Sequence, residues 1–492
     1  MQLNADKLVC SIKKPRKEFT KKDIIKFIKD NNIPMLNFNY VGGDGKLKTL
    51  SFAINNESHL NELLEYGERV DGSSLFSYID SANSDVYVVP RFKTAFLNPF
   101  APLPTLNILC SYFDSNGKEL DIAPEYIVKK AHEQLKKHTG ISLNTLGELE
   151  YYVIFDKKEN DWFPGIPQKN YHESSPFVKF ENLRDEILYT ISSIGAKVKY
   201  AHSEVGNITL NGRSFEQYEI EFLPEPLEDM ADHIVIAKWI MRNISAKYGV
   251  GITFAPKLAF NHAGTGLHIH IEADKNNKNI TLDNNGKLSV TAKKIIGGLL
   301  ELAPSLTAFG NTNPISYMRL VPHQEAPTYI CWGEKNRSAL IRIPLGWALK
   351  NSMSKQVNKQ DTTKPTDCPE KQTFELRSPD GSANIHLLLA GIAVAARHGL
   401  MNDASLQLTQ DLYVDKNIFR SEKRNELKHL PVSCKESAKK LKEQESIYLE
   451  HNVFSQKIID GLIKRLESFD TKDLGTTPED IQKYIEKFIN CG

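Results

Sequence analysis

The sequence lacks the features that mark several classes of protein. Its six cysteines are scattered, with no CxxC pair and no zinc-type spacing, so neither a zinc site nor a dense disulfide framework is indicated. Its 62 Lys and Arg residues are balanced by 61 Asp and Glu residues, which argues against the positive field typical of nucleic-acid-binding proteins. The longest apolar stretch, around 387–396, is far shorter than a bilayer-spanning helix, and the N-terminus has no apolar signal segment. We therefore expect a globular, cytoplasmic protein without nucleic acid or membrane as a partner.

The usual nucleotide-binding motifs are also missing. No GxxxxGK[ST] loop is present, and Gly264-Thr-Gly266 lacks the third glycine of a dinucleotide-binding loop. Taken alone, this short segment is typical of a turn before a strand. Neither a P-loop nor a Rossmann site is supported.

The chain divides into a tail and two domains. Residues 1–19 are polar, and their basic cluster (Lys13, Lys14, Arg16, Lys17) predicts a solvated tail. Residues 20–118 predict a small α/β unit, in which Thr20 caps a helix and strand-like segments span 35–54 and 86–108. Residues 122–492 predict a larger domain that ends in a helix-rich segment, 434–487. Within it, apolar spacing predicts helices over 125–138, 184–194, 230–248, 291–302 and 386–398.

Several strand-like segments of the larger domain carry charged residues two positions apart. The pairs are Glu148 and Glu150, Glu219 and Glu221, His268 and His270, and Glu375 and Arg377. Because side chains alternate along a strand, each pair projects from one face. For any single pair, a sheet with one solvated side is the better explanation of the pattern. The four pairs together are harder to explain as a solvated surface, because these faces offer Glu, His and Arg with almost no Lys, Ser or Thr.

This choice of residue types points to a kind of chemistry. Carboxylates with one imidazole suit Mg²⁺ or Mn²⁺. The arginines Arg319, Arg337, Arg342 and Arg377 suit phosphate and carboxylate groups, which a guanidinium can bind through two parallel hydrogen bonds. Metals and arginines around one cavity are typical of phosphoryl transfer, where positioning and charge neutralisation supply most of the catalysis. The residues alone do not identify the substrate.

Seven groups of residues, in order along the chain, resemble the motifs of the type I glutamine synthetase family. They are Val70-Asp-Gly-Ser-Ser-Leu75, Gly147-Glu-Leu-Glu150, His202-Ser-Glu-Val205, Gly264-Thr-Gly-Leu-His-Ile-His270, Arg319-Leu-Val-Pro322 with Glu325-Ala-Pro327, Asn336-Arg-Ser-Ala-Leu-Ile-Arg-Ile-Pro344, and Glu375-Leu-Arg-Ser-Pro-Asp380. The resemblance implies an α+β fold with an N-terminal β-grasp-like domain and a C-terminal catalytic domain whose curved antiparallel sheet is flanked by helices. It also implies a homo-oligomer, a hexameric ring stacked into a dodecamer, with active sites between subunits.

The family further implies a reaction and its site. ATP would drive ligation of ammonia to the γ-carboxylate of L-glutamate through γ-glutamyl phosphate, with two Mg²⁺ or Mn²⁺ ions in each site. The resemblance assigns one ion to Glu150, Glu204 and Glu219 and the other to Glu148, His268 and Glu375. It assigns glutamate to Arg319, Arg377 and Gly264, and the ATP phosphates to His270, Arg337 and Arg342. Ammonium would be bound by Asp71, Ser74, Tyr171, Glu204 and Glu325, with Asp71 as the proton acceptor and Glu325 on a flap that excludes water; Asp71 and Ser74 would come from a neighbouring subunit.

Each assignment has a plainer alternative, and the sequence departs from the family pattern in places. Asp71-Gly72 is also an ordinary turn, Tyr171 could be a packing residue, and Glu375 with Arg377 could form a salt bridge on one face. Ala263 replaces the family's asparagine before Gly264, residues 207–215 form an extra loop between Glu204 and Glu219, and residues 487–492 lack the usual acidic and aromatic tail. Two other functions stay open: ligation of glutamate to a polyamine or alkylamine, and a non-catalytic structural or regulatory role.

Overall fold

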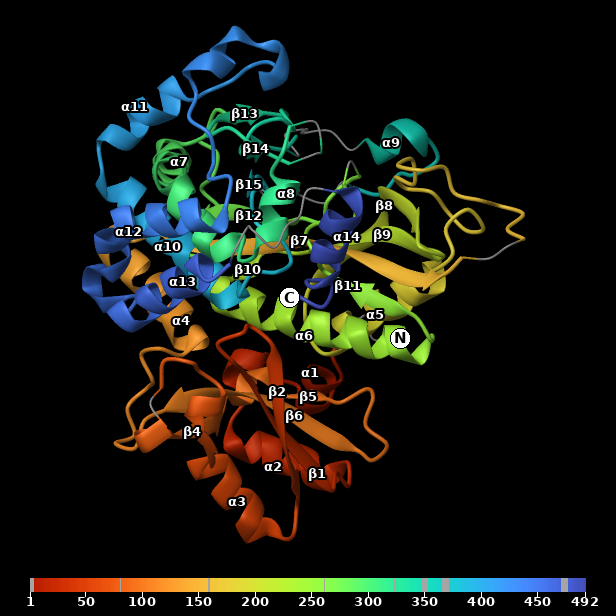
Figure 1. Cartoon of the computed structure of the whole chain (residues 1–492). Helices are drawn as coiled ribbons and strands as arrows, with labels where there is room; N and C mark the ends of the chain where they lie inside the picture. Colours follow the sequence, from red (N-terminus) through yellow and green to blue (C-terminus); the bar gives the residue numbers. More distant parts are fainter. Residues whose placement is uncertain are drawn as a thin grey trace.

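The computed structural model describes residues 4–79, 81–157, 160–260, 262–322, 324, 326–346, 353–364, 371–469 and 477–492. Within these ranges the chain builds two sheets, one in each part of the molecule. The smaller part lies below the larger one in Figure 1, and helix α6 (Leu227–Lys247) runs between them.

The first sheet has the strand order β2-β1-β6-β4-β3, and β5 pairs with β6. Strands β1 and β6 are parallel, while the other pairs are antiparallel. The helix α2 begins at the predicted cap, because Thr20 and Asp23 form a capping box. The strands of this part are β1 (Met35–Val41), β2 (Leu47–Ala53), β3 (Glu68–Asp71), β4 (Asp85–Pro90), β5 (Phe96–Leu97) and β6 (Thr105–Phe113), and its helices are α1 (Lys7–Ile12), α2 (Lys21–Asp30) and α3 (Glu57–Tyr66).

The N-terminal segment is not the solvated tail predicted from its basic residues. Helix α1 is capped by Asp6, and Leu8 is buried in the small domain. Arg16 forms an ion pair with Asp6 at 2.6 Å and donates to the carbonyl oxygens of Ala95 and Ile194. These contacts anchor the described part of the segment to both domains. The prediction is wrong because the carbonyl partners of Arg16 lie far from it in the sequence, where the local composition does not indicate them.

The second sheet curves around the functional residues described below. Its strand order is β13-β14-β15-β12-β7-β9-β8, with β10 and β11 also paired to β7. All its pairs are antiparallel except β13 with β14. The strands are β7 (Ser142–Asp156), β8 (Val198–Leu210), β9 (Arg213–Phe222), β10 (Glu225–Pro226), β11 (Gly251–Thr253), β12 (Leu267–Asp274), β13 (Trp332–Glu334), β14 (Ile341–Ile343) and β15 (Phe374–Leu376).

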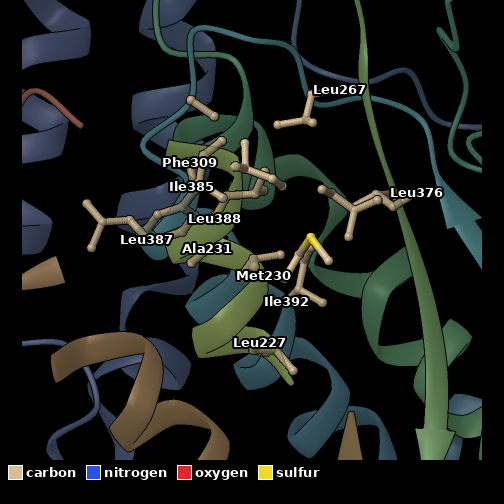
Figure 2. Packing of buried hydrophobic residues seen from close by; sticks show 14 of the residues in the cluster. Leu227, Met230, Ala231, Leu267, Phe309, Leu376, Ile385, Leu387, Leu388 and Ile392 are labelled. Atoms are coloured by element: carbon tan, nitrogen blue, oxygen red, sulfur yellow. The ribbon is translucent and has the colours of Figure 1, made fainter. Parts of the chain in front are cut away.

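Helices cover the back of this sheet and fill the core. Figure 2 shows residues of α6, α7 and α10 packed together beside Leu267 of β12 and Leu376 of β15. Almost every side chain of α10 is buried, which explains why this helix is apolar on all sides. The helices of this part are α4 (Pro124–Thr139), α5 (Glu181–Ser193), α6, α7 (Val290–Gly310), α8 (Pro314–Arg319), α9 (Ser354–Val357), α10 (Ile385–Met401), α11 (Ala404–Asp411), α12 (Cys434–Leu449), α13 (Gln456–Glu467) and α14 (Pro478–Glu486).

Two further sequence expectations can be compared with the structure. The extra loop expected over residues 207–215 is instead the tip of a β-hairpin, because β8 and β9 continue their pairing to a turn at Asn211 and Gly212. No single helix in the described ranges is long and apolar enough to span a membrane; α10 and α11 satisfy the criterion only as a pair, across a bend of 107°.

Candidate active site

A cavity of about 670 Å³ opens on the concave face of the second sheet. Strands β7, β8, β9, β12, β14 and β15 each contribute side chains to it. Most of the site residues predicted from the sequence line this cavity: Glu148, Glu150, Tyr171, Glu204, Glu219, Gly264, His268, His270, Arg319, Arg337, Arg342, Glu375 and Arg377. The fold thus brings together residues that are spread over more than 200 positions of the sequence.

The strand register places the acidic and imidazole side chains in two rows. Directly opposed residues of antiparallel strands project from the same face, about 5 Å apart. One row crosses β12, β7, β9 and β8 through His268, Glu148, Glu221 and Tyr200. The next row crosses β7, β9 and β8 through Glu150, Glu219 and His202. The two-residue spacing in the sequence therefore becomes a grid of donors on one surface.

At the other side of the cavity, β14, β15 and the residue that follows β15 add two arginines and a carboxylate. Glu375 stands opposite His270 on one side and Arg342 on the other. Its carboxylate accepts from Arg377 Nε at 3.0 Å and from Arg342 Nη1 at 2.9 Å. Burial opposes ionisation of Glu375, and so does Glu148, but Arg377 and the imidazoles lower its pKa. The carboxylate is therefore ionised between two cations.

Glu148 lies between both imidazoles of strand β12. Its two carboxylate oxygens are each 2.9 Å from a ring nitrogen, Oε2 from His268 Nδ1 and Oε1 from His270 Nε2. Burial disfavours the charged carboxylate, but His270 and His268 hold the pKa of Glu148 well below its usual range. Glu219 behaves in the opposite way: burial, with Glu148, Glu150 and other carboxylates nearby, raises its pKa well above the usual value.

The donor set fits divalent cations. In three groups the possible ligand atoms lie within 4.8 Å of one another: Glu148, Glu219 and His268; Glu148, His270 and Glu375; and His202, Glu204 and Glu219. Oxygen donors with an occasional imidazole are the ligands that Mg²⁺ and Mn²⁺ accept. A cation would also relieve the repulsion that raises the pKa of Glu219. Glu150 is in none of these three groups but lies beside the first, with Oε1 3.9 Å from His268 Nε2.

The remaining predicted substrate contacts surround the same donors. Arg319 is buried and donates to the backbone carbonyls of Ser378, Pro379 and Arg377. Its Nη2 also lies 3.4 Å from His268 Nε2, so the guanidinium borders the metal-binding donors. Tyr171 is 48% exposed, and its ring packs against the imidazole of His202.

Asp71 and Ser74 lie on the small domain and are not among the described residues that line the cavity. The Asp71 carboxylate accepts from Ser74 Oγ at 2.6 Å and from Ser73 Oγ and N at 2.7 and 2.9 Å. The hydrogen bonds from Ser74 and Ser73 hold the pKa of Asp71 well below its usual range. The loop thus presents an ionised carboxylate at the surface. Glu325 lies outside the described residues.

Three residues in or beside the cavity received no role from the sequence: His202 and Glu221, which stand in a motif and a charged pair named above, and Gln217. His202 and Glu221 line the cavity directly, and Glu221 forms an ion pair with Lys199 at 2.7 Å. Gln217 lies behind the donors and contacts Glu150. The two-residue spacing could have indicated a role for Gln217, because Gln217, Glu219 and Glu221 alternate along β9 and therefore share one face. Only the register with β7 and β8 shows which neighbours these side chains meet.

Comparison with known proteins places the chain in a family. The family described as glutamine synthetase, catalytic domain, matches residues 121–484, and the family described as glutamine synthetase, beta-Grasp domain, matches residues 32–115. Glutamine synthetase of Aquifex aeolicus is 28% identical over 471 residues, covering 90% of this chain and 93% of the relative. That of Thermococcus kodakarensis is 31% identical over 411 residues, covering 82% and 83%.

Solved structures share the fold. Plasmodium falciparum glutamine synthetase, determined by cryo-EM, aligns with a TM-score of 0.76 and 21% identity over 96% of this chain and 97% of that one. A protein named GmaS, in complex with ADP, aligns with a TM-score of 0.75 and 18% identity over 94% and 99%. The family that matches the chain consists of metal-dependent, ATP-using ligases, and the acidic and imidazole groups of the cavity are candidates for its metal-binding site. The chain belongs to the glutamine synthetase family. This confirms the predicted family and the predicted fold of a β-grasp domain followed by a catalytic domain with a curved sheet.

Proposed function

We propose that the protein ligates ammonia to the γ-carboxylate of L-glutamate, using ATP and giving L-glutamine, ADP and phosphate. The observation that carries this proposal is the grid of carboxylates, imidazoles and arginines in one cavity of about 670 Å³. Membership of the family supports the same reaction. A non-catalytic relative is disfavoured, because the complete set of metal-ligating side chains is present in the sequence.

Two divalent cations, Mg²⁺ or Mn²⁺, would bind in the grid. In our assignment Glu148, His268 and Glu375 hold the ion nearer the ATP phosphates, and Glu150, Glu204 and Glu219 hold the ion nearer glutamate. His270, which lies 2.9 Å from Glu148, would orient that carboxylate in addition to contacting phosphate. When bound, the ions neutralise the phosphate charge and polarise the γ-carboxylate.

The arginines would bind the anionic substrates. Arg319 and Arg377, with the backbone of Gly264, are assigned to glutamate, and Arg337 and Arg342 to the phosphates. Arg342 and Arg377 already share the carboxylate of Glu375, so both guanidinium groups are held at the edge of the cavity before any substrate binds. Such preorganisation lowers the entropic cost of aligning the two substrates.

The reaction would proceed in two steps. A γ-carboxylate oxygen of glutamate attacks the γ-phosphorus of ATP, the bond to the β-phosphate oxygen breaks, and ADP leaves. Ammonia then attacks the acyl carbon of γ-glutamyl phosphate, inorganic phosphate leaves with its bonding electron pair, and the added nitrogen releases one proton to give the amide. We assign Arg337 to the charge on the transferred phosphoryl group and Glu325 to a flap that excludes water.

The nucleophile would come from ammonium. Asp71, Ser74, Tyr171, Glu204 and Glu325 are assigned to its pocket. Because the pKa of Asp71 lies low, its carboxylate is ionised and can attract the cation. We assign the same carboxylate as the acceptor of the ammonium proton. Asp71 lies on the small domain of this chain, so we assign it to the cavity of a neighbouring subunit, in a hexameric ring of a dodecamer.

A larger amine is the second candidate for the acceptor. Two tyrosine rings line the cavity, Tyr171 at 48% exposed and Tyr200 at 42% exposed. Aromatic rings bind organic ammonium groups through cation–π contacts, and the Tyr200 ring already makes one with Lys199, whose Nζ lies 4.9 Å from the ring centroid. Ammonium remains the preferred acceptor in our proposal, because the carboxylate and hydroxyl groups assigned to its pocket are all present.

Product analysis tests the proposal. Purified protein is incubated with glutamate, ATP and Mg²⁺, and ammonium, methylamine, ethylamine or putrescine is supplied singly at equal concentration. Phosphate release and the amide product are measured together. We expect glutamine from ammonium at the highest kcat/KM. Preferential formation of a γ-glutamylamide from another amine would replace ammonia by that amine, and the absence of turnover with every amine would reject a ligase function.

A further inference from the structure

Gln217 lies on the same face of β9 as Glu219 and Glu221, two residues before Glu219 and therefore in the row next to the two rows of donors. Strand register places it opposite Tyr152 of β7, in the row after Glu150 and Glu219. The side chain is buried, with 2% of its residue surface exposed. An amide in such a position must find partners for both of its polar atoms.

Its three contacts reach three different elements. Nε2 donates to Glu150 Oε2 and to the carbonyl oxygen of Gly264, both at 2.9 Å. Oε1 accepts from the backbone N–H of Gly206 at 3.0 Å. The amide therefore joins β7, the turn before β12, and β8, and both of its amide hydrogens are used.

These contacts determine how Glu150 presents its carboxylate. Oε2 also accepts from the backbone N–H of Gly266 at 2.7 Å, so this oxygen is engaged by two donors. The other oxygen, Oε1, is the one that lies 3.9 Å from His268 Nε2 among the possible metal ligands. With Oε2 held in this way, the carboxylate cannot rotate freely, and Oε1 points toward the donor grid.

The close packing of the Gly206 backbone against Gln217 also holds the amide in this position. A side chain added at Gly206 would strike the hydroxyl of Tyr152 and Oε1 of Gln217. The amide is therefore closed in by β8 on the side away from Glu150. A glutamine held at both ends by backbone groups is a rigid support for the carboxylate between them.

We propose that Gln217 is a positioning residue that orients Glu150 for metal binding and links it to the Gly264 turn. This role rests on the proposed metal site, but it does not depend on which amine the enzyme uses. Loss of the amide would remove one of the two donors to Oε2 of Glu150 and leave the Gly264 carbonyl without this donor. Metal affinity would fall, and glutamate binding, assigned in part to Gly264, would weaken with it.

Metal binding without substrates is the test. Mn²⁺ is titrated into metal-free wild-type protein and into Gln217→Met, which has a side chain of similar length but no amide. Loss of a group that supports a metal ligand typically weakens metal affinity by about 10- to 100-fold, and we expect a change in this range. Gln217→Asn, which keeps the amide on a shorter side chain, should fold even if Gln217→Met does not, and should also weaken Mn²⁺ binding.

Gln168 provides a matched control. Its Oε1 accepts from the backbone N–H of Ala263 at 2.8 Å, so it supports the same turn but has no hydrogen bond to Glu150. We expect Gln168→Met to bind Mn²⁺ within about twofold of wild type. A Gln217→Met or Gln217→Asn protein that folds and binds Mn²⁺ like wild type would overturn the proposal. Equal weakening in Gln168→Met would also overturn it, because the effect would then reflect general loosening of the turn.

A second readout uses the metal-free protein. In Gln217→Met the Gly206 amide loses its acceptor, so hydrogen exchange of the segment around Gly206 should accelerate while the core helices keep their protection. Unchanged exchange there would contradict the assigned contacts. Neither readout involves turnover, so a failure of the proposed reaction and a failure of this inference give different results.

Discussion

A buried ion pair joins the small domain to the catalytic domain, and we expect its loss to destabilise the protein strongly. Arg91 donates to Asp232 through Nη1 at 2.8 Å and Nη2 at 3.0 Å, and His386 Nε2 lies 3.0 Å from the same carboxylate. Only 4% of the Asp232 side chain is exposed. Asp232→Asn keeps the shape but removes the charge of the carboxylate that is hydrogen-bonded to the largely buried guanidinium. We expect it to lower the free energy of unfolding by about 3 to 5 kcal/mol.

Urea denaturation followed by tryptophan fluorescence can measure this loss. Trp239 of α6 reports on the interface, because its ring lies 6.1 Å from the ring of Phe96 and 5.2 Å from that of Phe100. Arg91→Met is measured alone and together with Asp232→Asn. The double variant removes both charges of the Arg91–Asp232 pair, so it should lose less stability than the two single losses combined. A loss under about 1 kcal/mol for Asp232→Asn, or additivity within about 0.5 kcal/mol, would refute the reasoning.

The same pair predicts a pH dependence. Burial opposes ionisation of Asp232, but Arg91 and His386 hold its pKa well below the ordinary value. A carboxyl group with a depressed pKa contributes stability above its unfolded-state pKa, about 3.9, and loses that contribution as the pH falls further. The difference in unfolding free energy between wild type and Asp232→Asn should therefore be constant from neutral pH down to about 5 and shrink below about 4. A difference that grows toward acidic pH would contradict this assignment.

Three further predictions concern the site and the fold. Glu150→Ala and His268→Ala should each abolish glutamine formation while size-exclusion chromatography shows an unchanged oligomer; full activity in either variant would reject its role as a ligand. Asp71→Asn should be nearly inactive, but mixed oligomers formed with Glu150→Ala subunits should regain activity, up to about a quarter of wild type for random mixing, because intact sites then form between subunits. No recovery in oligomers shown to be mixed would place Asp71 and the cavity in the same chain. Thr20→Ala should lower the free energy of unfolding by about 1 kcal/mol through loss of the capping box, whereas Thr20→Ser should be near wild type; equal losses would argue against the cap.

Local patterns predicted the elements that depend on local forces. Thr20 and Asp23 mark the start of α2 because the capping box involves only neighbouring residues. The alternation of Glu148 and Glu150, or of His268 and His270, predicted which side chains share a face because strand geometry fixes the period. The continuous apolar run of α10 likewise predicted a helix, and its burial follows from the helices packed around it.

Contacts between distant residues were beyond the reach of such patterns. Arg16 meets Ile194 across 178 positions, and nothing in the sequence around the basic cluster indicates this carbonyl partner. The hairpin tip over residues 207–215 was read as a loop, although Asn211-Gly212 is a common hairpin turn. Gln217 was overlooked because its role depends on the register between β7 and β9. The composition of the cavity could be predicted, whereas the supporting contacts required the fold.

The fate of labelled substrates tests the central claim most directly. The protein is incubated with ATP, Mg²⁺, ¹⁵N-ammonium and glutamate carrying ¹⁸O in both γ-carboxylate oxygens, and the products are analysed by mass spectrometry. The proposed acyl phosphate predicts ¹⁵N-glutamine that retains one ¹⁸O, with the other ¹⁸O in inorganic phosphate. Phosphate without ¹⁸O, or labelled phosphate without ¹⁵N-glutamine, would contradict ligation of ammonia through γ-glutamyl phosphate.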